Sequence, residues 1–522
     1  DVTYHLYTHT NHGYFEPYIS QIGDTLHTMI RDLKNAYEKR LGISYPYRDL
    51  SLIEAPIHFA SFASPMRFSD EFIQPMQVLI PENGITINSA DFRAQIYRMT
   101  NRSQSRNQTM SEKERQYLVL QRFLEGTFLY NMPGRPFGPT TAQRHYSIFP
   151  NFYTFVNQIS TDKMPVLDAA LDIYLRSKAE AQGGGFMRFR SGLTDEEKAN
   201  VRLRDRSLEQ MLQSPEDVAW VGNALKSKSN YFFRLLEGKI GEEQLSTFLA
   251  EGLARSRFQV WSGDDWAASL QDRGINLTAE YDRWYRLSQT PGFLFSNIQH
   301  YAVLQQDRAR YQVKFTVANP SQVDGIIVVD FQLRGPGGPG GFGGPGGFGG
   351  GFFMQMSAQT DYQRIIPVAA GQSKQIALLT DEEPRSLIIN TLVSQNLPMQ
   401  IIHRFERFEE NSKAAPVEEE RVLDRPPSGS ANTGEIVVDN ESVGFQVLTQ
   451  KKRTPLQRLL KVKYQAEEEY LPLRPWQIPE FWAKTVNSDF YGDMVLSAHF
   501  IRSGDGSQKA AWKSDLPESG NY

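Results

Sequence analysis

Residues 310–334 are RYQVKFTVANPSQVDGIIVVDFQLR, and here the chain changes from helical to β-type patterning. Apolar and polar side chains alternate in the first half and apolar ones run together in the second, which is typical of strands. The turn-forming residues Asn319, Pro320 and Ser321 stand between the two runs, so we expect a hairpin. Similar runs continue to residue 410 and predict a small β-sandwich.

Before residue 310, the hydrophobic pattern is first a mixture of strand and helix periods and then helical. Residues 1–10 and 48–58 alternate as strands do, and an amphipathic helix is predicted between them over 21–41, with Gly42 just past its end. Apolar positions three and four apart dominate 165–290 and predict a helical bundle. We expect its packing anchors to be Trp220, Trp261, Trp266 and Trp284.

Two segments interrupt the later pattern. GPGGPGGFGGPGGFGGGFF, at 335–353, lacks glycine at every third place, so it is predicted to be a loop of the sandwich and not collagen. Residues 411–434 are charged and then rich in Pro, Ser and Gly, as linkers are. We therefore predict a multidomain α+β chain. Its parts are an α/β domain (1–180), a helical domain (181–300), a β-sandwich (301–410), the linker (411–434) and a second β-sandwich (435–522).

The composition limits the possible functions. A net charge of −4 gives no basic field, so we expect no nucleic-acid partner. The absence of cysteine excludes disulfides and thiolate zinc sites. No run reaches the ~18 apolar residues that a membrane-spanning helix needs. The strand-like start DVTYHLYTH and the end at Gly520-Asn521-Tyr522 lead us to expect a fragment of a larger protein.

HYSIFPNFYTFVNQISTDKMPVLDAALDIYL, residues 145–175, resembles the zinc-binding region of the aminopeptidase N family, the gluzincin (M1) peptidases. That family's HELAHQWFGNLV sets two His one helical turn apart, beside a Glu that polarises the zinc-bound water. KNAYEKRLGISYPYRDLSLIEAPIH (34–58) resembles the family's helix, turn and strand before the substrate-binding segment. The resemblance covers about residues 1–300 and implies a thermolysin-like fold for the α/β domain.

The residues that carry the family's chemistry are mostly replaced. His145 matches the first zinc ligand, whereas Tyr146 stands at the catalytic Glu and Phe149 at the second His. The third ligand position falls on Ala169, or on Asp168 if the gap is one residue shorter. Tetrahedral zinc needs three protein ligands, so we predict no metal, no cofactor and no catalytic residue, and hence a pseudo-enzyme.

The substrate-binding segment is replaced by SFASPMRFSDEFIQ (61–74), in which Asp70 and Glu71 are candidates for a ligand-binding surface. An alternative hypothesis keeps an active zinc metallopeptidase. Its atypical ligand set would come from His145, Asp168 and Asp172.

Three C-terminal strings resemble a golvesin-like or xanthan-lyase-like accessory β-sandwich: EIVVDNESVGF (435–445), FWAKTVNSDFYGD (481–493) and KAAWKSDLPESGNY (509–522). Aromatic rings can stack on sugars, so a second alternative is a glycan-binding envelope protein. Its candidate ligand-binding residues are Trp482, Tyr491 and Trp512.

The combination of these regions with INTLVSQNLP (389–398) resembles the extracytoplasmic parts of ABC-transporter permease proteins of Bacteroidota. This resemblance implies a non-catalytic binding or coupling module on the periplasmic face of a bacterial membrane. The implied partners are membrane segments or transporter subunits of the same system, with a peptide, protein or glycan as ligand.

Overall fold

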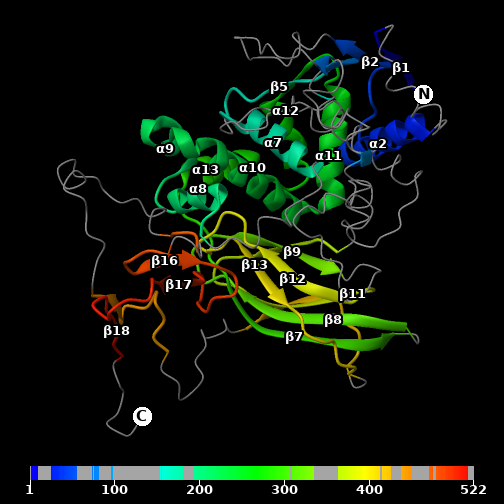
Figure 1. Cartoon of the computed structure of the whole chain (residues 1–522). Helices are drawn as coiled ribbons and strands as arrows, with labels where there is room; N and C mark the ends of the chain where they lie inside the picture. The colour runs from blue at the N-terminus through cyan, green and yellow to red at the C-terminus, as the bar shows by residue number, and fades with distance from the viewer. Residues whose placement is uncertain are drawn as a thin grey trace. The chain divides into compact units, whose positions relative to one another are not determined.

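The computed structural model describes most of the chain from residue 156 onward and parts of the region before it (Figure 1). The described residues are 2–9, 25–55, 73–74, 76–81, 96–97, 153, 156–179, 192–305, 308–333, 362–411, 414–424, 437–448, 470–473 and 478–514. The chain groups into two units, each with its own contacts. Unit 1 comprises 1–182, 243–274 and 342–360, and unit 2 comprises 183–242, 275–341 and 361–522. The five-part domain division stays a prediction.

Unit 1 contains a mixed sheet with the strand order β1-β2-β4-β3. Its strands are β1 (Thr3–Tyr7), β2 (Asp49–Ala55), β3 (Ile73–Gln74) and β4 (Gln77–Pro81). β1, β2 and β4 run parallel, and β3 pairs antiparallel with β4. Parallel neighbours need a crossover connection, and helix α2 (Thr25–Leu41) lies within the one between β1 and β2.

The predicted first helix is confirmed over the described residues, Thr25–Leu41. Tyr37 on its apolar face is buried. Gly42 has φ +72° and donates its N–H to the carbonyl of Glu38 at 2.8 Å, so it ends the helix in the left-handed conformation that glycine favours. A Cβ at Gly42 would lie 2.7 Å from the Cβ of Ala250, so the helix end also packs too closely for a side chain.

The other elements of unit 1 pack around an aromatic cluster. They are β5 (Gln158–Ser160), α7 (Leu167–Ala179), α11 (Glu242–Arg255), β6 (Val260–Ser262) and α12 (Gly263–Gln271). Trp261 and Trp266 are buried as predicted, with ring centroids 4.9 Å apart, and Phe248 packs against both. A Cβ at Gly252 would fall 2.0 Å from the Trp261 ring, so α11 needs glycine there.

Unit 2 begins with a group of helices. They are α8 (Asp195–Leu203), α9 (Leu208–Gln213), the 3-10 turn η3 (Pro215–Asp217), α10 (Val218–Ile240) and α13 (Leu277–Arg286). Capping boxes start α8 and α9. Trp284 is buried as predicted. Trp220 is only half-buried, and Lys198 and Arg202 lie over its ring.

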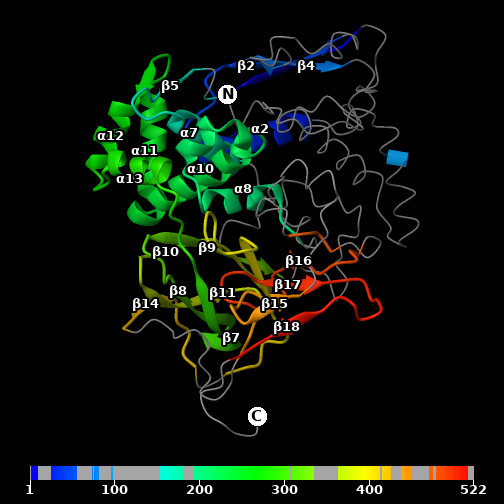
Figure 2. The ribbon, with the colours of Figure 1, turned by 90° about the vertical axis from the view of Figure 1, so that its left-hand side faces the viewer.

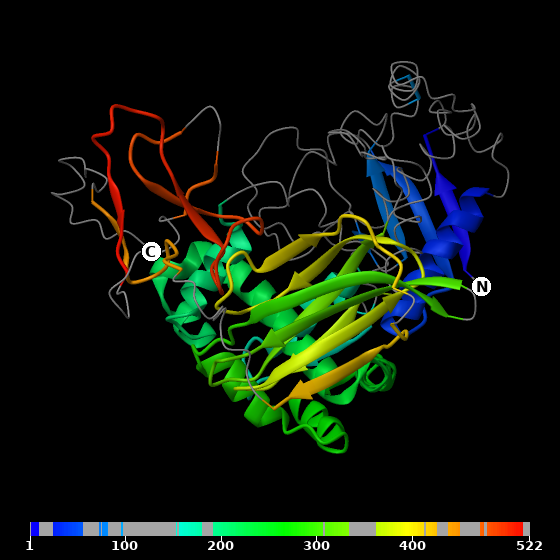
Figure 3. The same cartoon turned by 90° about the horizontal axis from the view of Figure 1, so that it is seen from below.

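The predicted β-sandwich is confirmed as two antiparallel sheets, ordered β10-β9-β12-β13 and β14-β11-β8-β7 (Figure 3). Its strands are β7 (Leu294–Gln305), β8 (Arg308–Ala318), β9 (Gly325–Leu333), β10 (Arg364–Val368), β11 (Ser373–Thr380), β12 (Pro384–Asn390), β13 (Gln400–Arg404) and β14 (Glu419–Leu423). Buried side chains from both sheets form one core, which includes Phe315, Ile327 and Ile376.

The predicted hairpin of β8 with β9 is wrong, because the two strands lie in opposite sheets. The connection over 319–324 crosses the sandwich instead of folding back in a tight turn. Asn319, which is fully buried, fixes this corner by donating to the carbonyls of Val323 at 2.9 Å and Val368 at 3.0 Å. The two apolar runs therefore face each other across the core.

The described C-terminal residues form two two-stranded antiparallel pairs. β15 (Phe445–Val447) pairs with β18 (Ala510–Trp512), and β16 (Ala483–Val486) pairs with β17 (Ser497–Phe500). Both pairs lie beside the sandwich within unit 2 (Figure 2). Across the described ranges, no helix has the length and apolar character needed to traverse a membrane.

Candidate ligand-binding site

The predicted remnant of a zinc site is only partly visible. His145, Tyr146 and Phe149 lie outside the described residues, and so do Asp70 and Glu71. Asp168 and Ala169 lie in the first turn of α7, where the N–H of Asp168 donates to Thr161 Oγ1 at 3.1 Å.

Asp172, in the alternative ligand set, accepts a hydrogen bond of 2.6 Å from the hydroxyl of Tyr153. Asp168 and Asp172 are one helical turn apart on α7. Within the described ranges, no three His, Asp or Glu side chains gather closely enough to hold a metal ion.

The three aromatic candidates lie on different parts of the C-terminal region. Trp482 precedes β16 and is half-buried, Tyr491 lies in the connection to β17 and is 60% exposed, and Trp512 lies on β18 and is 56% exposed. One face of Trp512 packs against Phe445, with ring centroids 5.1 Å apart. No stacking joins the three rings to one another in the described part of the chain.

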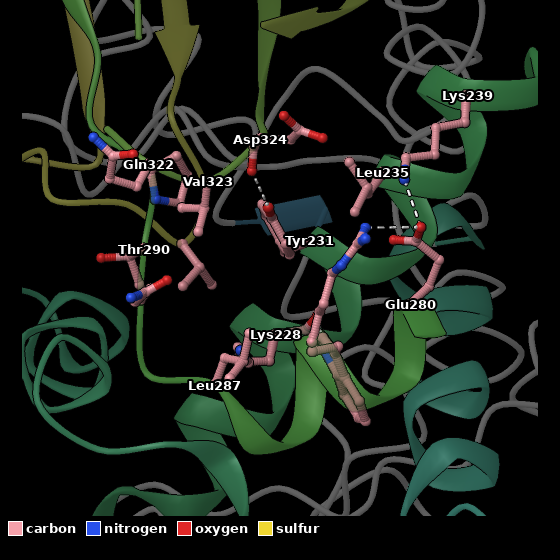
Figure 4. A pocket seen from close by; sticks show the side chains of 15 residues that line it. Lys228, Tyr231, Leu235, Lys239, Glu280, Leu287, Thr290, Gln322, Val323 and Asp324 are labelled. Atoms are coloured by element: carbon pink, nitrogen blue, oxygen red, sulfur yellow. Dashed lines mark hydrogen bonds and ion pairs between the residues drawn. The ribbon is translucent and has the colours of Figure 1, made fainter. Parts of the chain in front are cut away.

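A pocket that the sequence analysis did not predict lies within unit 2. It encloses about 290 Å³ between α10, α13, the segment that follows α13, the β8–β9 connection and Val393 (Figure 4). The Lys239–Glu280 ion pair lies on one side of the cavity, and Thr290 and Gln322 lie on the other. Lys228 lies between them, beside Leu287.

Lys228 is the unusual member of this pocket. It is only 5% exposed, and apolar side chains such as Leu287 and Val393 line the same cavity. Desolvation by burial lowers the pKa of its ammonium group to about 8, with no carboxylate acting against it. No hydrogen bond or ion pair holds this ammonium among the described residues. A buried cation without a partner is costly, so its presence needs an explanation.

Neighbouring aromatic packing fixes where Lys228 sits. The indole Nε1 of Trp284 donates to the backbone carbonyl of Lys228 at 2.7 Å, which ties α13 to α10. The Trp284 ring packs against Phe232 and Tyr281, with centroid distances of 5.3 and 5.8 Å. The backbone that carries Lys228 is therefore held rigidly at the cavity.

The far side of the pocket contains groups that already have partners. Glu280 is 9% exposed and accepts from Lys239 at 2.7 Å and from Arg283 at 3.3 Å, so two cations surround one carboxylate. The hydroxyl of Tyr231 donates to the carbonyl of Asp324 at 3.0 Å, and burial raises the pKa of Tyr231, which keeps the phenol neutral. The pocket thus combines apolar walls with an excess of cationic side chains.

The loop over 391–399 connects this pocket to the rest of unit 2. Val393 lines the cavity, and Asn200 of α8 donates to the carbonyl of Ser394 at 2.8 Å. Buried Asn396 accepts from the N–H of Phe293 at 2.9 Å and donates to its carbonyl at 2.8 Å. A few residues further, Leu397 donates to the carbonyl of Met494 at 2.9 Å and accepts from Leu496 at 2.7 Å. One loop therefore joins α8, the sandwich and the β16–β17 pair to the pocket wall.

No family model and no curated protein matches this chain. Among solved structures, the chain is similar to the crystal structure of Legionella pneumophila aminopeptidase A in complex with aspartic acid, with 11% sequence identity and a TM-score of 0.30. The match covers 72% of this chain and 35% of the aminopeptidase chain, so this chain spans about a third of that protein's length. At this similarity, the function of the chain has to be argued from its own residues.

Proposed function

We propose that this chain is a non-catalytic binding module that takes a small carboxylate ligand in the Lys228 pocket. The observation that supports this is the buried ammonium group of Lys228, which faces a cavity and has no partner among the described residues. A bound carboxylate would supply the missing charge and accept charge-assisted hydrogen bonds from it.

The size and lining of the pocket agree with a small organic anion. Its volume of about 290 Å³ lies at the lower end of the ~300–1,000 Å³ that is usual for ligand pockets. The apolar side chains of Leu235, Leu287 and Val393 would pack against an aliphatic part of the ligand. Together with Lys228, the cations Lys239 and Arg283 outnumber the two carboxylates that line the pocket, Glu280 and Asp324, which favours an anion.

The wider setting of this module is part of the same proposal. We place it in the extracytoplasmic part of a bacterial membrane protein related to ABC-type permeases. It would have an aminopeptidase N-like region without a working zinc site and a golvesin-like C-terminal part. What supports this setting is the resemblance of the sequences over 34–58, 145–175 and 435–522. In such a protein, the loop over 391–399 would couple pocket occupancy to neighbouring elements.

The test is a calorimetric titration of the full chain with a monocarboxylate series from acetate to octanoate. Wild type is compared with Lys228→Met and with Lys226→Met. Lys226 is a matched control, because it lies on the same helix, pairs with Glu196 at 2.6 Å and does not line the pocket.

We expect wild type and Lys226→Met to bind one member of the series alike. Lys228→Met should bind it roughly 10- to 100-fold more weakly, which is the usual loss for a hydrogen bond to a charged group. Equal binding by all three proteins, or binding of no carboxylate by wild type, would contradict the proposal.

A further inference from the structure

A second cavity adjoins the Lys228 pocket within unit 2. It encloses about 480 Å³ and shares four lining residues with the first cavity. These are Gln289, Thr290, Gln322 and Val323. Gln289 and Gln322 are exposed and polar, so the boundary between the cavities is made of side chains that can move and form hydrogen bonds.

Arg204 lines this second cavity and is incompletely satisfied. One of its terminal nitrogens donates to the carbonyl of Gln395, while its Nε–H is buried without a hydrogen-bond partner. No ion pair joins the guanidinium to a carboxylate in the described parts of the chain. A guanidinium presents a planar fork of donors that matches a carboxylate, so Arg204, which lines this cavity, is suited to one.

The charged groups around Arg204 do not supply its guanidinium with an anionic partner. Desolvation lowers the pKa of Arg204, and it outweighs the opposite effects of Tyr470, Asp205 and Glu441. Glu441 is already engaged by Lys484 at 2.7 Å. The two adjoining cavities therefore each contain a cation that lacks an anionic partner in direct contact.

We infer that the ligand is an α,ω-dicarboxylate, with one carboxylate at Lys228 and the other at Arg204. This inference rests on the proposed function and adds the second anionic group and the length of the molecule. The ligand's middle part would pass Gln289, Thr290 and Gln322, whose side chains offer hydrogen-bond donors and acceptors. Two charged ends held at a fixed separation select one chain length, because a shorter ligand reaches only one cation.

The test is a titration of the full chain with succinate, glutarate, adipate, pimelate and suberate. Each is paired with the monocarboxylate of the same carbon number. The proteins are wild type, Arg204→Gln, Arg204→Lys and Arg364→Gln. Arg364 is a control cation on the sandwich, where it pairs with Glu418 at 3.2 Å and lines neither cavity. Circular dichroism and a thermal scan of each variant establish that it is folded.

In wild type and Arg364→Gln, we expect one dicarboxylate to bind about 10- to 100-fold more tightly than its matched monocarboxylate. Arg204→Gln should remove this gain, so that a dicarboxylate binds no more tightly than its matched monocarboxylate. Arg204→Lys keeps the charge without the fork, so it should retain only part of the gain and serves as the folded reference if Arg204→Gln is unstable.

The inference is overturned if no dicarboxylate exceeds its matched monocarboxylate, or if the gain survives in both Arg204 variants. These results are distinct from failure of the proposed function, in which wild type binds no carboxylate or Lys228→Met binds as wild type does. Binding of monocarboxylates through Lys228 alone would leave the proposed function intact and reject the dicarboxylate.

Discussion

Replacing Lys228 with methionine is expected to stabilise the ligand-free protein while it weakens ligand binding. Burial lowers the pKa of Lys228 from 10.5 to about 8. At ~1.36 kcal/mol per pKa unit, keeping this amine protonated in the fold costs about 3 kcal/mol at pH 7. Methionine has a similar length and no charge, so most of this cost should disappear. We therefore expect a gain of about 1–3 kcal/mol in the free energy of unfolding.

The pH dependence separates this electrostatic effect from a packing effect. Below pH 8, both folded and unfolded states hold the proton, so the full cost of burying the charge is present. As pH rises from about 8 towards 10.5, the folded state loses the proton before the unfolded state does, and wild type becomes relatively more stable. The advantage of Lys228→Met should therefore shrink across this window.

The assay is differential scanning calorimetry of wild type, Lys228→Met and Lys226→Met at pH 7 and pH 10. Each kcal/mol should raise the melting temperature of unit 2 by roughly 2–4 °C. Lys226→Met loses a surface ion pair with Glu196 and should stay within ~0.5 kcal/mol of wild type. If Lys228→Met is less stable than wild type at pH 7, or if its advantage is the same at both pH values, then burial of the Lys228 amine carries no electrostatic cost in the fold.

Carboxylate affinity should be constant below pH 8 and fall above it, because only protonated Lys228 binds an anion; a Kd that does not change between pH 7 and pH 9.5 would exclude this. Asn396→Leu should destabilise unit 2 by about 2–4 kcal/mol in urea unfolding, since it leaves the buried N–H and C=O of Phe293 unpaired; a loss under ~1 kcal/mol would show that these bonds matter little. Elemental analysis of the purified protein, with an aminopeptidase assay on the same sample, should find neither stoichiometric zinc nor turnover; activity abolished by His145→Ala would instead establish the metallopeptidase alternative.

Local patterns in the sequence predicted much of the fold. Apolar residues three and four apart over 21–41, followed by Gly42, predicted helix α2. This worked because an apolar helix face and a C-terminal glycine depend only on residues close together in the sequence. The sandwich followed from period-2 runs. The strand partners of β8 could not be predicted in this way. The corner after β8, which sends the chain to the other sheet, is held by a hydrogen bond from Asn319 to Val368, 49 residues away. Alternation shows that a strand exists but not which sheet it joins.

The sequence indicated the pocket only weakly. Lys228 interrupts an apolar row at helical spacing that includes Ala224, Phe232 and Leu236, all fully buried or nearly so. A lysine in such a row indicates a buried amine and could have marked a site. Its cavity could not be predicted, because the walls come from α13, the β8–β9 connection and the loop at Val393, which only the tertiary fold brings together.

The most direct measurement is the pKa of Lys228 itself, followed by NMR of the full chain with selectively labelled lysines. Lys228→Met identifies its resonance. We expect one lysine that titrates near pH 8 in the free protein and shifts towards 10.5 when a saturating carboxylate supplies its missing partner. A Lys228 that titrates at the ordinary value without ligand, or a pKa that saturating carboxylate does not move, would contradict it.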